Sequence, residues 1–338
     1  MPSCGTQCYL CDVPIRFDTY KGCTHACKYC FVKKNNDITK IKNGEGVESL
    51  KNFINGKRNL ETNWADWDIP LHWGGMSDPF QPVEKARRRS LECLKVFAET
   101  QYPFLVSTKG RLVADDEYLD LLSKCNCAVQ ISMLCSGYDK IEPGCPTFEE
   151  RLVMLEKVSK RVKRTIVRMQ PYLHEFYKDI KANIPRIADA GAYGIVVEGM
   201  KFFGKKVKGT VRVGGDFCYP VEVLRADFEG LKNEAHKHGL KFFVGENRLR
   251  SMGDDLCCCG VGDMFKVNTF NLNHLLNGDK TEPTAGQMKQ GTAECFSSLK
   301  QETAFRKYIQ KQNFAEYMVK FYEENKKTVD ETMGLTTK

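Results

Sequence analysis

The chain has 338 residues, 16 of them Cys, and a formal net charge of +8. No run approaches the ~18 apolar residues of a membrane-spanning helix, which argues against a transmembrane protein. The first residues, MPSCGTQCYL, lack the basic and apolar regions of a secretory signal. We therefore expect a cytoplasmic protein with no membrane partner, whose cysteines are reduced thiols or metal ligands rather than disulfides.

Residues 1–13 form a Cys-rich N-terminal extension. Cys4, Cys8 and Cys11 are spaced Cys-x3-Cys-x2-Cys. The same spacing recurs shortly afterwards, so we predict that the extension contributes to an additional metal site. Enrichment in Cys without a bound metal is the alternative.

The second Cys-rich stretch, residues 20–32, reads YKGCTHACKYCFV and contains Cys23, Cys27 and Cys30. Three thiolates within eight residues can wrap a loop around a soft metal centre. A fully ligated iron–sulfur cluster or a structural zinc takes four protein ligands. Three ligands leave one position open, as a catalytic centre requires. A zinc knuckle or a redox-sensing thiol cluster is the alternative.

From residue 14 onwards, short apolar runs alternate with longer stretches of helical periodicity. The predicted strands are 15–19, 69–73, 104–107, 128–133, 164–169, 194–198 and, as a candidate seventh, 241–244. The predicted helices are 47–55, 83–99, 115–123, 148–158, 180–190 and 224–238. This alternation predicts an α/β fold with parallel strands and helical crossovers.

Three regions are expected: the extension 1–13, a core domain 14–250, and a C-terminal part 251–338. The C-terminal part contains a Cys-rich loop and two predicted helices, 286–299 and 304–326. Residues 204–215, GKKVKGTVRVGG, form a basic, Gly-rich excursion between the sixth strand and the next helix. We interpret the excursion as a candidate substrate loop, with a plain solvated hairpin as the alternative.

The spacing of Cys23, Cys27 and Cys30, with aromatic Tyr29 before the last Cys, resembles the radical S-adenosylmethionine (SAM) superfamily. The run SDPFQPVEK at 77–85, and Glu142-Pro143-Gly144 followed by Pro146 and Arg151, resemble its spore photoproduct lyase-like (SplB-type) group. The resemblance covers roughly residues 14–250. It implies a partial (β/α)6 TIM-like barrel with active-site residues at the carboxyl ends of the strands.

The resemblance also implies a [4Fe–4S] cluster on Cys23, Cys27 and Cys30, with SAM on the open iron. One electron, from a donor such as flavodoxin or ferredoxin, would cleave SAM to a 5′-deoxyadenosyl radical. Polar and Gly residues at the strand ends then become candidates for binding SAM. They are Gly74, Gly75, Asp78, Ser107, Lys109, Ser132, Arg168 and Glu198.

Two positions depart from the pattern of spore photoproduct lyase itself. The hydrogen-donating Cys before the Ser-Asp pair is replaced by Met76, whose thioether has no S–H. The residue after Cys30 is Phe31, without a hydroxyl. Cys135, after the fourth strand, is a candidate substitute hydrogen donor, and a buried structural thiol is the alternative reading.

Three consecutive cysteines, Cys257, Cys258 and Cys259, follow the last predicted strand. Consecutive residues point in different directions, so packing alone explains them poorly. A segment after a late strand can lie beside one before the first strand. We therefore predict a second metal site, for zinc or an auxiliary iron–sulfur cluster. Its ligands would be Cys8 and Cys11 from the extension with Cys257 and Cys258; unrelated reduced thiols are the alternative.

The sequence thus predicts a radical SAM enzyme that abstracts hydrogen from its substrate. A nucleobase or nucleic acid, in DNA repair or modification, is the first candidate for that substrate. A peptide or a small metabolite is the second. A non-catalytic zinc or iron–sulfur protein that binds nucleic acid is the contrasting class.

Overall fold

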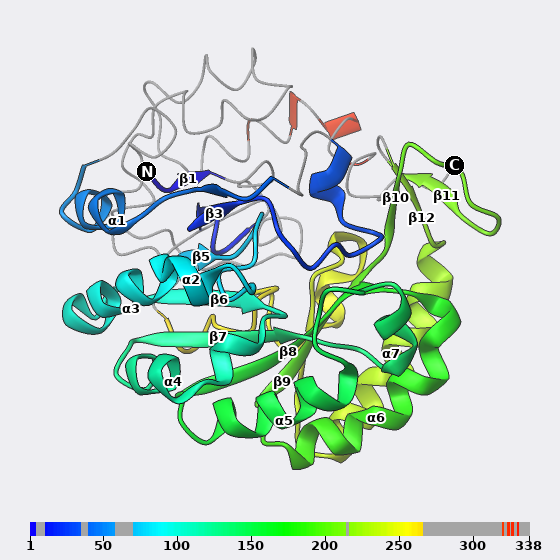
Figure 1. Cartoon of the computed structure of the whole chain (residues 1–338). Helices are drawn as coiled ribbons and strands as arrows, with labels where there is room; N and C mark the ends of the chain where they lie inside the picture. The colour runs from blue at the N-terminus through cyan, green and yellow to red at the C-terminus, as the bar shows by residue number, and fades with distance from the viewer. Residues whose placement is uncertain are drawn as a thin grey trace.

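The computed structural model describes residues 1–4, 11–34, 40–57, 70–213 and 216–265, together with residues 320, 323, 324, 326, 327 and 330. Its centre is one eight-stranded sheet in which β1 is antiparallel to β2 and the other seven strands are parallel (Figure 1). The strands, in spatial order, are β1 (Ser3–Cys4), β2 (Ile15–Phe17), β5 (Leu71–Trp73), β6 (Phe104–Thr108), β7 (Cys127–Ser132), β8 (Arg164–Tyr172), β9 (Gly194–Gly199) and β13 (Lys241–Val244).

Spatial order in this sheet follows chain order, as the repeated strand–helix pattern predicted. The predicted α/β fold of the partial barrel type is therefore confirmed, and the candidate seventh strand is β13. Strand β7 is buried along its whole length because both faces of the sheet are covered.

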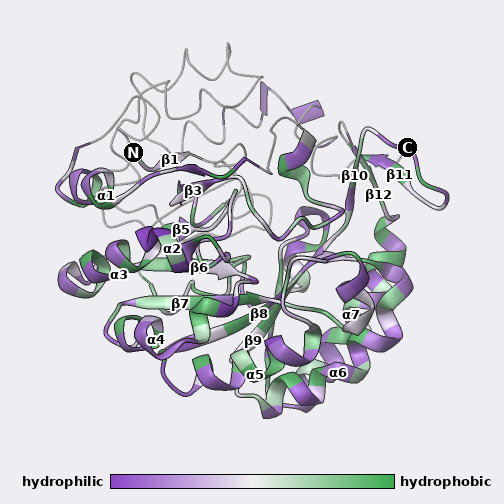
Figure 2. Ribbon diagram, viewed as in Figure 1, coloured by the Kyte–Doolittle hydropathy of each residue, from purple (hydrophilic) through white to green (hydrophobic). Residues whose placement is uncertain are grey.

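Helices pack on the outer face of the sheet, with their apolar sides towards it and their polar sides outward (Figures 1 and 2). They are α1 (Val47–Ile54), α2 (Glu84–Arg87), α3 (Arg89–Thr100), α4 (Asp116–Leu122), α5 (Phe148–Ser159), α6 (Tyr177–Asp189) and α7 (Val221–Lys237). None of the helices in the described ranges combines the length and apolar character needed to cross a membrane.

The single helix predicted over 83–99 is wrong in one respect, because it is broken at Arg88, which has φ +51°. Glu84, at the start of α2, is fully buried and turns its carboxylate towards the next helix. It accepts hydrogen bonds from the N–H groups of Ser90 at 3.0 Å and Leu91 at 2.9 Å. These bonds satisfy free donors in the first turn of α3, so the break is stabilised by a cap.

The two faces of the sheet bury two separate apolar clusters. Phe104 and Val106 belong to the cluster under the helices, whereas Leu105 between them belongs to the inner cluster. This alternation is the period of two expected of a strand. The inner cluster also contains Val13, from before β2, and a segment after β13 that includes Cys257 and Cys259. The two ends of the core domain therefore meet on the inner face of the sheet.

Two small sheets accompany the main one. Strands β3 (Tyr20–Lys21) and β4 (Lys42–Asn43) pair beside the Cys-rich loop. Strands β10 (Lys201–Phe203), β11 (Val211–Val213) and β12 (Asp216–Cys218) form a three-stranded antiparallel sheet with β12 in the middle. Within the basic excursion, residues 211–213 form strand β11 of this sheet, and residues 204–210 form the connection from β10 to β11.

The predicted C-terminal helices, 286–299 and 304–326, lie outside the described residues except for residues 320, 323, 324 and 326, which are helical.

Candidate active site

The Cys-rich loop between β3 and the following short helix wraps back on itself. Gly22, with φ +89°, and Ala26, with φ +51°, take left-handed conformations that turn the chain. The N–H of Cys30 donates to the carbonyl of Cys27 at 3.2 Å. As a result, the side chains of Cys23, Cys27 and Cys30 all line one cavity of about 300 Å³.

Three free thiols on one cavity wall are a suitable donor set for an iron–sulfur cluster with an open position. In the part of the chain that the structure describes, no three His, Cys, Asp or Glu side chains surround the position of a single metal ion. A [4Fe–4S] cluster does not need such an arrangement, because it distributes its thiolates over separate irons.

Gly74 and Gly75, after β5, form a cradle at the same cavity. Gly74 has φ +87°, and a Cβ atom there would lie 2.4 Å from the carbonyl oxygen of Ser107. A Cβ atom on Gly75 would lie 2.8 Å from the Cδ atom of Arg16. Only Gly lets the chain turn here and leaves its backbone open to a ligand. These positions therefore fit the backbone contact with SAM that the sequence predicted.

Asp18, directly after β2, binds the backbone that follows the Gly74–Gly75 turn. Its Oδ1 accepts hydrogen bonds from the N–H groups of Met76 at 3.0 Å and Ser77 at 3.1 Å. Burial raises the pKa of Asp18 from 3.8 to about 7, and the two N–H donors only partly oppose that rise. The position of the turn is thus tied to a carboxyl group that titrates near neutral pH.

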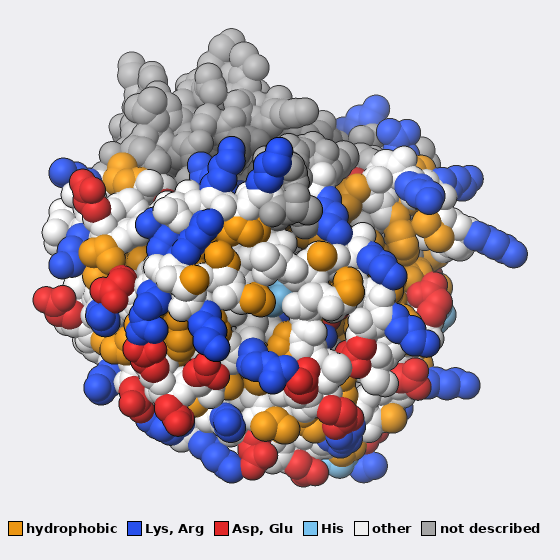
Figure 3. Space-filling model, in the orientation of Figure 1, with side chains coloured by type: hydrophobic (Ala, Val, Ile, Leu, Met, Phe, Trp, Pro, Cys, Tyr) orange, Lys and Arg blue, Asp and Glu red, His pale blue; other side chains and the backbone are white. Residues whose placement is uncertain are grey.

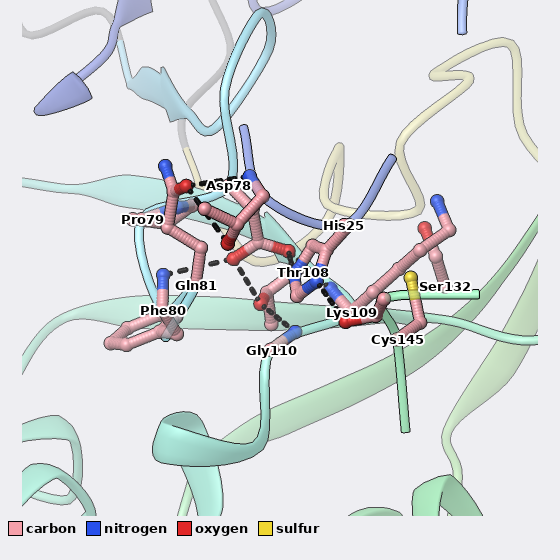
Figure 4. A network of polar contacts seen from close by, with 12 residues as sticks. His25, Asp78, Pro79, Phe80, Gln81, Thr108, Lys109, Gly110, Ser132 and Cys145 are labelled. Carbon is pink, nitrogen blue, oxygen red and sulfur yellow. Dashed lines mark hydrogen bonds and ion pairs between the residues drawn. The ribbon is translucent and has the colours of Figure 1, made fainter. Parts of the chain in front are cut away.

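Asp78 accepts hydrogen bonds from several loops at once (Figure 4). Its Oδ1 accepts from the hydroxyl of Thr108 at 2.7 Å and the N–H of Phe80 at 2.8 Å. Its Oδ2 accepts from the N–H of Lys109 at 2.6 Å and lies 3.1 Å from Nε2 of His25. Although burial alone would raise it, the pKa of Asp78 is lowered because His25 and the N–H donors outweigh burial.

His25 lies inside the Cys-rich loop, between Cys23 and Cys27, and connects it to two other loops. Its Nδ1 is 2.9 Å from the carbonyl oxygen of Gly144, while Nε2 faces Asp78. Burial opposes protonation of His25, but the charge of Asp78 outweighs burial and raises the pKa. The sequence analysis did not identify His25, although its place between two predicted ligands was a usable signal.

A buried group of charges supports the other side of the loop. Glu142 and Arg151 are each 1% exposed, and Arg151 Nη2 donates to Glu142 Oε2 at 2.5 Å. Arg151 also donates to the carbonyl of Ser132 at 2.7 Å. The hydroxyl of Tyr29 donates to the other oxygen of Glu142. The Cys-rich loop and the segment around Glu142 are therefore in direct contact through Tyr29.

The inner face of the sheet carries a chain of polar contacts across neighbouring strands. Nε2 of His72 lies 3.0 Å from Oγ of Ser107, which donates to Oε1 of Gln130 at 2.9 Å. Arg168 donates to the same oxygen at 2.8 Å. Burial first, and then the charges of Arg168 and Arg16, lower the pKa of His72 to about 3. His72 is therefore neutral at physiological pH.

All eight residues predicted to bind SAM line the same cavity as the three cysteines. They are Gly74, Gly75, Asp78, Ser107, Lys109, Ser132, Arg168 and Glu198. Their common position follows from the parallel sheet, because the carboxyl ends of its strands meet at one edge. Their individual roles stay predictions.

Cys135 occupies a different environment. Its side chain is 1% exposed and belongs to the apolar cluster under the helices. Burial raises the pKa of its thiol to about 11. Cys135 is not among the residues that line the cavity. The hydrogen-donor role stays a prediction, and this position corresponds to the alternative reading, a buried structural thiol.

The structure brings together some of the cysteines that the sequence predicts as ligands of a second metal site. Cys11, Cys258 and Cys259 line a second cavity of about 430 Å³, whereas Cys257 packs in the inner apolar cluster. Cys8 lies outside the described residues. The predicted meeting of the two chain segments is thus confirmed, but no metal-binding group is found among the described residues there.

The second cavity adjoins the first. Arg168, Glu198 and Lys201 line both cavities. Arg250, a buried residue that the sequence analysis missed, also lines the second, and two of its buried nitrogens have no hydrogen-bond partner. The cavity beneath the Cys-rich loop therefore continues along the inner face of the sheet, and several Arg and Lys side chains line it.

No protein-family model matches the chain. Uncharacterized proteins of Mycobacterium bovis and Mycobacterium tuberculosis are 24% identical to it over 223 residues. The match covers 61% of this chain and 63% of each relative, so the chain spans less than two thirds of the length of these relatives.

Among solved structures, spore photoproduct lyase complexed with dinucleoside spore photoproduct matches with a TM-score of 0.56 at 14% identity. This match covers 69% of the present chain and 76% of the lyase chain. A double mutant of the lyase with bound AdoMet and the same dinucleoside matches with a TM-score of 0.55 at 15% identity. The likeness shows that the chain has the fold of spore photoproduct lyase, which is a radical SAM fold.

The elevated pKa of Asp18 gives a testable pH dependence. The folded protein keeps a proton on Asp18 up to about pH 7, whereas the unfolded carboxyl, with a pKa of 3.8, loses it earlier. The free energy of unfolding should therefore fall as the pH rises through this window. Asp18→Asn keeps an acceptor oxygen but cannot ionise, so we expect a smaller fall. Urea unfolding at a series of pH values and fixed salt measures it.

Asp120→Asn is the matched control, because Asp120 is an exposed carboxylate on the outer surface. Its pH profile should follow that of the wild type. An Asp18→Asn profile as steep as the wild type's would contradict the assignment.

Proposed function

We propose that this protein is a radical SAM enzyme. Cys23, Cys27 and Cys30 would hold a [4Fe–4S] cluster, and the Gly74–Gly75 cradle with the polar strand ends would hold SAM. The bound cofactors supply one chemistry, the one-electron reductive cleavage of SAM to a 5′-deoxyadenosyl radical that abstracts hydrogen from the substrate. The observation that supports the proposal most is the shared cavity of three thiols and eight predicted SAM-binding residues.

The chain's own residues provide position and shielding. The Asp78–His25 contact fixes the Cys-rich loop against the ends of β5 and β6. Tyr29 and Arg151 converge on buried Glu142 and close the other side of the loop. A radical intermediate needs a site from which water is excluded, and buried contacts of this kind help to exclude it. An external donor such as flavodoxin or ferredoxin would supply the electron.

A nucleic acid or nucleotide is our first proposal for the substrate. Lys205, Lys206 and Lys208, in the connection between β10 and β11, and Arg212 on β11 are exposed, and basic side chains gather there on the face shown in Figure 3. Phe203 and Lys201 of the same sheet line the cofactor cavity. A basic surface beside an active-site cavity can attract a polyanion and guide one base into the site.

A small metabolite is the second proposal, since one observation favours it. The inner cavity of about 430 Å³ is the size of a small-molecule pocket, and it is lined by Arg16, Arg168 and Arg250. Lys201 also lines this cavity, as do the acidic Glu198 and Asp216, so the basic residues outnumber the acidic ones and a compact anionic molecule would fit. The two proposals differ in whether binding depends on the outer basic surface.

The cluster proposal predicts that replacing any one of Cys23, Cys27 or Cys30 by Ala abolishes SAM cleavage, because two ligands cannot present one open iron in fixed geometry. Anaerobically reconstituted protein should show the broad absorbance of an iron–sulfur cluster, and each variant should lose 5′-deoxyadenosine formation. Cys125→Ala, at the opposite end of the sheet, is the control and should retain both signals. Wild-type rates in any ligand variant would rule out the assignment.

The nucleic-acid proposal predicts that Lys205, Lys206 and Lys208 contribute to oligonucleotide binding. Changing all three to Ala should weaken binding of single-stranded DNA by about tenfold or more and reduce the dependence of affinity on salt. Fluorescence anisotropy at several salt concentrations measures both. The control changes Lys157, Lys160 and Lys163, on and after α5, to Ala. Equal affinities for wild type and variant would favour the metabolite instead.

Repair of spore photoproduct is a separate matter. Met76 lines the cavity but has no S–H, and Phe31 has no hydroxyl. We therefore expect no reversal of spore photoproduct in DNA under conditions in which SAM is cleaved. Product analysis of lesion-containing oligonucleotides by mass spectrometry tests this. Lesion turnover at a rate comparable with SAM cleavage would overturn the expectation.

A further inference from the structure

A cysteine that the sequence analysis did not single out lies against one of the proposed cluster ligands. Sγ of Cys145 is 3.7 Å from Sγ of Cys27. That separation is within hydrogen-bonding range for sulfur and far beyond the ~2.05 Å of a disulfide. Cys27 lines the cofactor cavity, whereas Cys145 is not one of its lining residues. Cys145 therefore approaches its partner from the protein side and leaves the open position of the site unobstructed.

The two thiols are carried by segments that are joined directly to each other. The N–H of Gly144 donates to the carbonyl of His25 at 3.0 Å, and Nδ1 of His25 lies 2.9 Å from the carbonyl of Gly144. The N–H of Lys28 donates to the carbonyl of Ile141 at 2.8 Å. A Cβ atom on Gly144 would lie 2.6 Å from the carbonyl oxygen of Thr24, so only Gly permits this approach.

Cys145 is also fixed within its own loop. Its N–H donates to the carbonyl of Glu142 at 3.0 Å, and the side chain of Glu142 is held by Arg151. Figure 4 shows Cys145 beside Lys109, at the edge of the contacts around Asp78. Backbone hydrogen bonds therefore hold the main chain of both cysteines in place, so the approach of their sulfur atoms does not depend on side-chain rotamers alone.

The direction of the hydrogen bond follows from the chemistry of a ligand. A cysteine that binds iron does so as a thiolate and has no proton to give. In the loaded enzyme Cys145 is then the only member of the pair that can donate. Its S–H would point at the sulfur atom of a cluster ligand.

We propose that Cys145 is a positioning residue that donates a hydrogen bond to the cluster-bound Cys27 thiolate and thereby raises the reduction potential of the cluster. This inference rests on the proposed function. Hydrogen bonds to the sulfur atoms are one of the factors that set the potential of an iron–sulfur cluster. The reduced cluster carries one more negative charge, so a donor stabilises it more than the oxidised cluster.

The test is an anaerobic redox titration of the full chain with reconstituted cluster, followed by electron paramagnetic resonance. Cys145→Ala and Cys145→Val remove the donor; Ala leaves the space of the sulfur empty, whereas Val fills it. In both we expect the equilibrium constant for reduction to fall about tenfold, which for one electron is a shift of about 59 mV to a more negative potential. Cys145→Ser keeps an O–H donor and should stay nearer the wild-type potential. Cys125→Ala is the control.

Iron content and the absorbance spectrum are measured on the same samples. Unchanged iron content together with a more negative reduction potential in Cys145→Ala or Cys145→Val supports the inference. Equal potentials in wild type and in both variants overturn it. Loss of iron from both variants also overturns it, because Cys145 would then hold the cluster rather than tune it. Absence of a cluster from the wild type itself would instead defeat the proposed function, so the two failures are distinguishable.

Discussion

The site depends on one buried carboxylate. Asp78 lies in the loop after β5, accepts hydrogen bonds from the end of β6, and faces a histidine in the Cys-rich loop. An ionised carboxylate in such a place is stable only while its partners are present, since burying an uncompensated charge costs several kcal/mol. The Gly74–Gly75 turn, proposed to hold SAM, and the Cys-rich loop, proposed to hold the cluster, are therefore held in register by a single group. A shift of either loop would leave part of that charge unpartnered.

A second constraint comes from the strands. Polar residues on the inner face form a continuous line from His72 through Ser107 and Gln130 to Arg168. Gln130 also donates to the carbonyl of Cys259 at 3.0 Å, which links this line to the segment after β13. Apolar residues of the same strands, such as Leu105 and Ile166, lie in the inner cluster. The interior is thus polar towards the cofactor cavity and apolar away from it.

Sequence alone predicted the features that depend on residue type and periodicity. The strand–helix alternation predicted the parallel sheet, and the rule that strand ends meet placed eight polar or Gly residues at one cavity. The break at Arg88 was missed because it depends on Glu84 turning its carboxylate back to the next helix. The contacts of His25 and Cys145 were missed for a similar reason. Both join residues that lie more than fifty positions apart, and nothing in local spacing signals such a meeting.

The inner cluster has a consequence for the order in which the chain can acquire its structure. Neighbouring strands of the main sheet are consecutive in the chain, so during synthesis each new strand can pair with the one just made. The cavity walls can therefore form early. The residues from Cys257 to Phe265, which cover the inner face together with Val13, leave the ribosome only after all eight strands of the main sheet have been made. Until then the apolar residues of the inner face, Leu105 and Ile166 among them, are open to solvent, so a nascent chain passes through a stage in which this face has no cover.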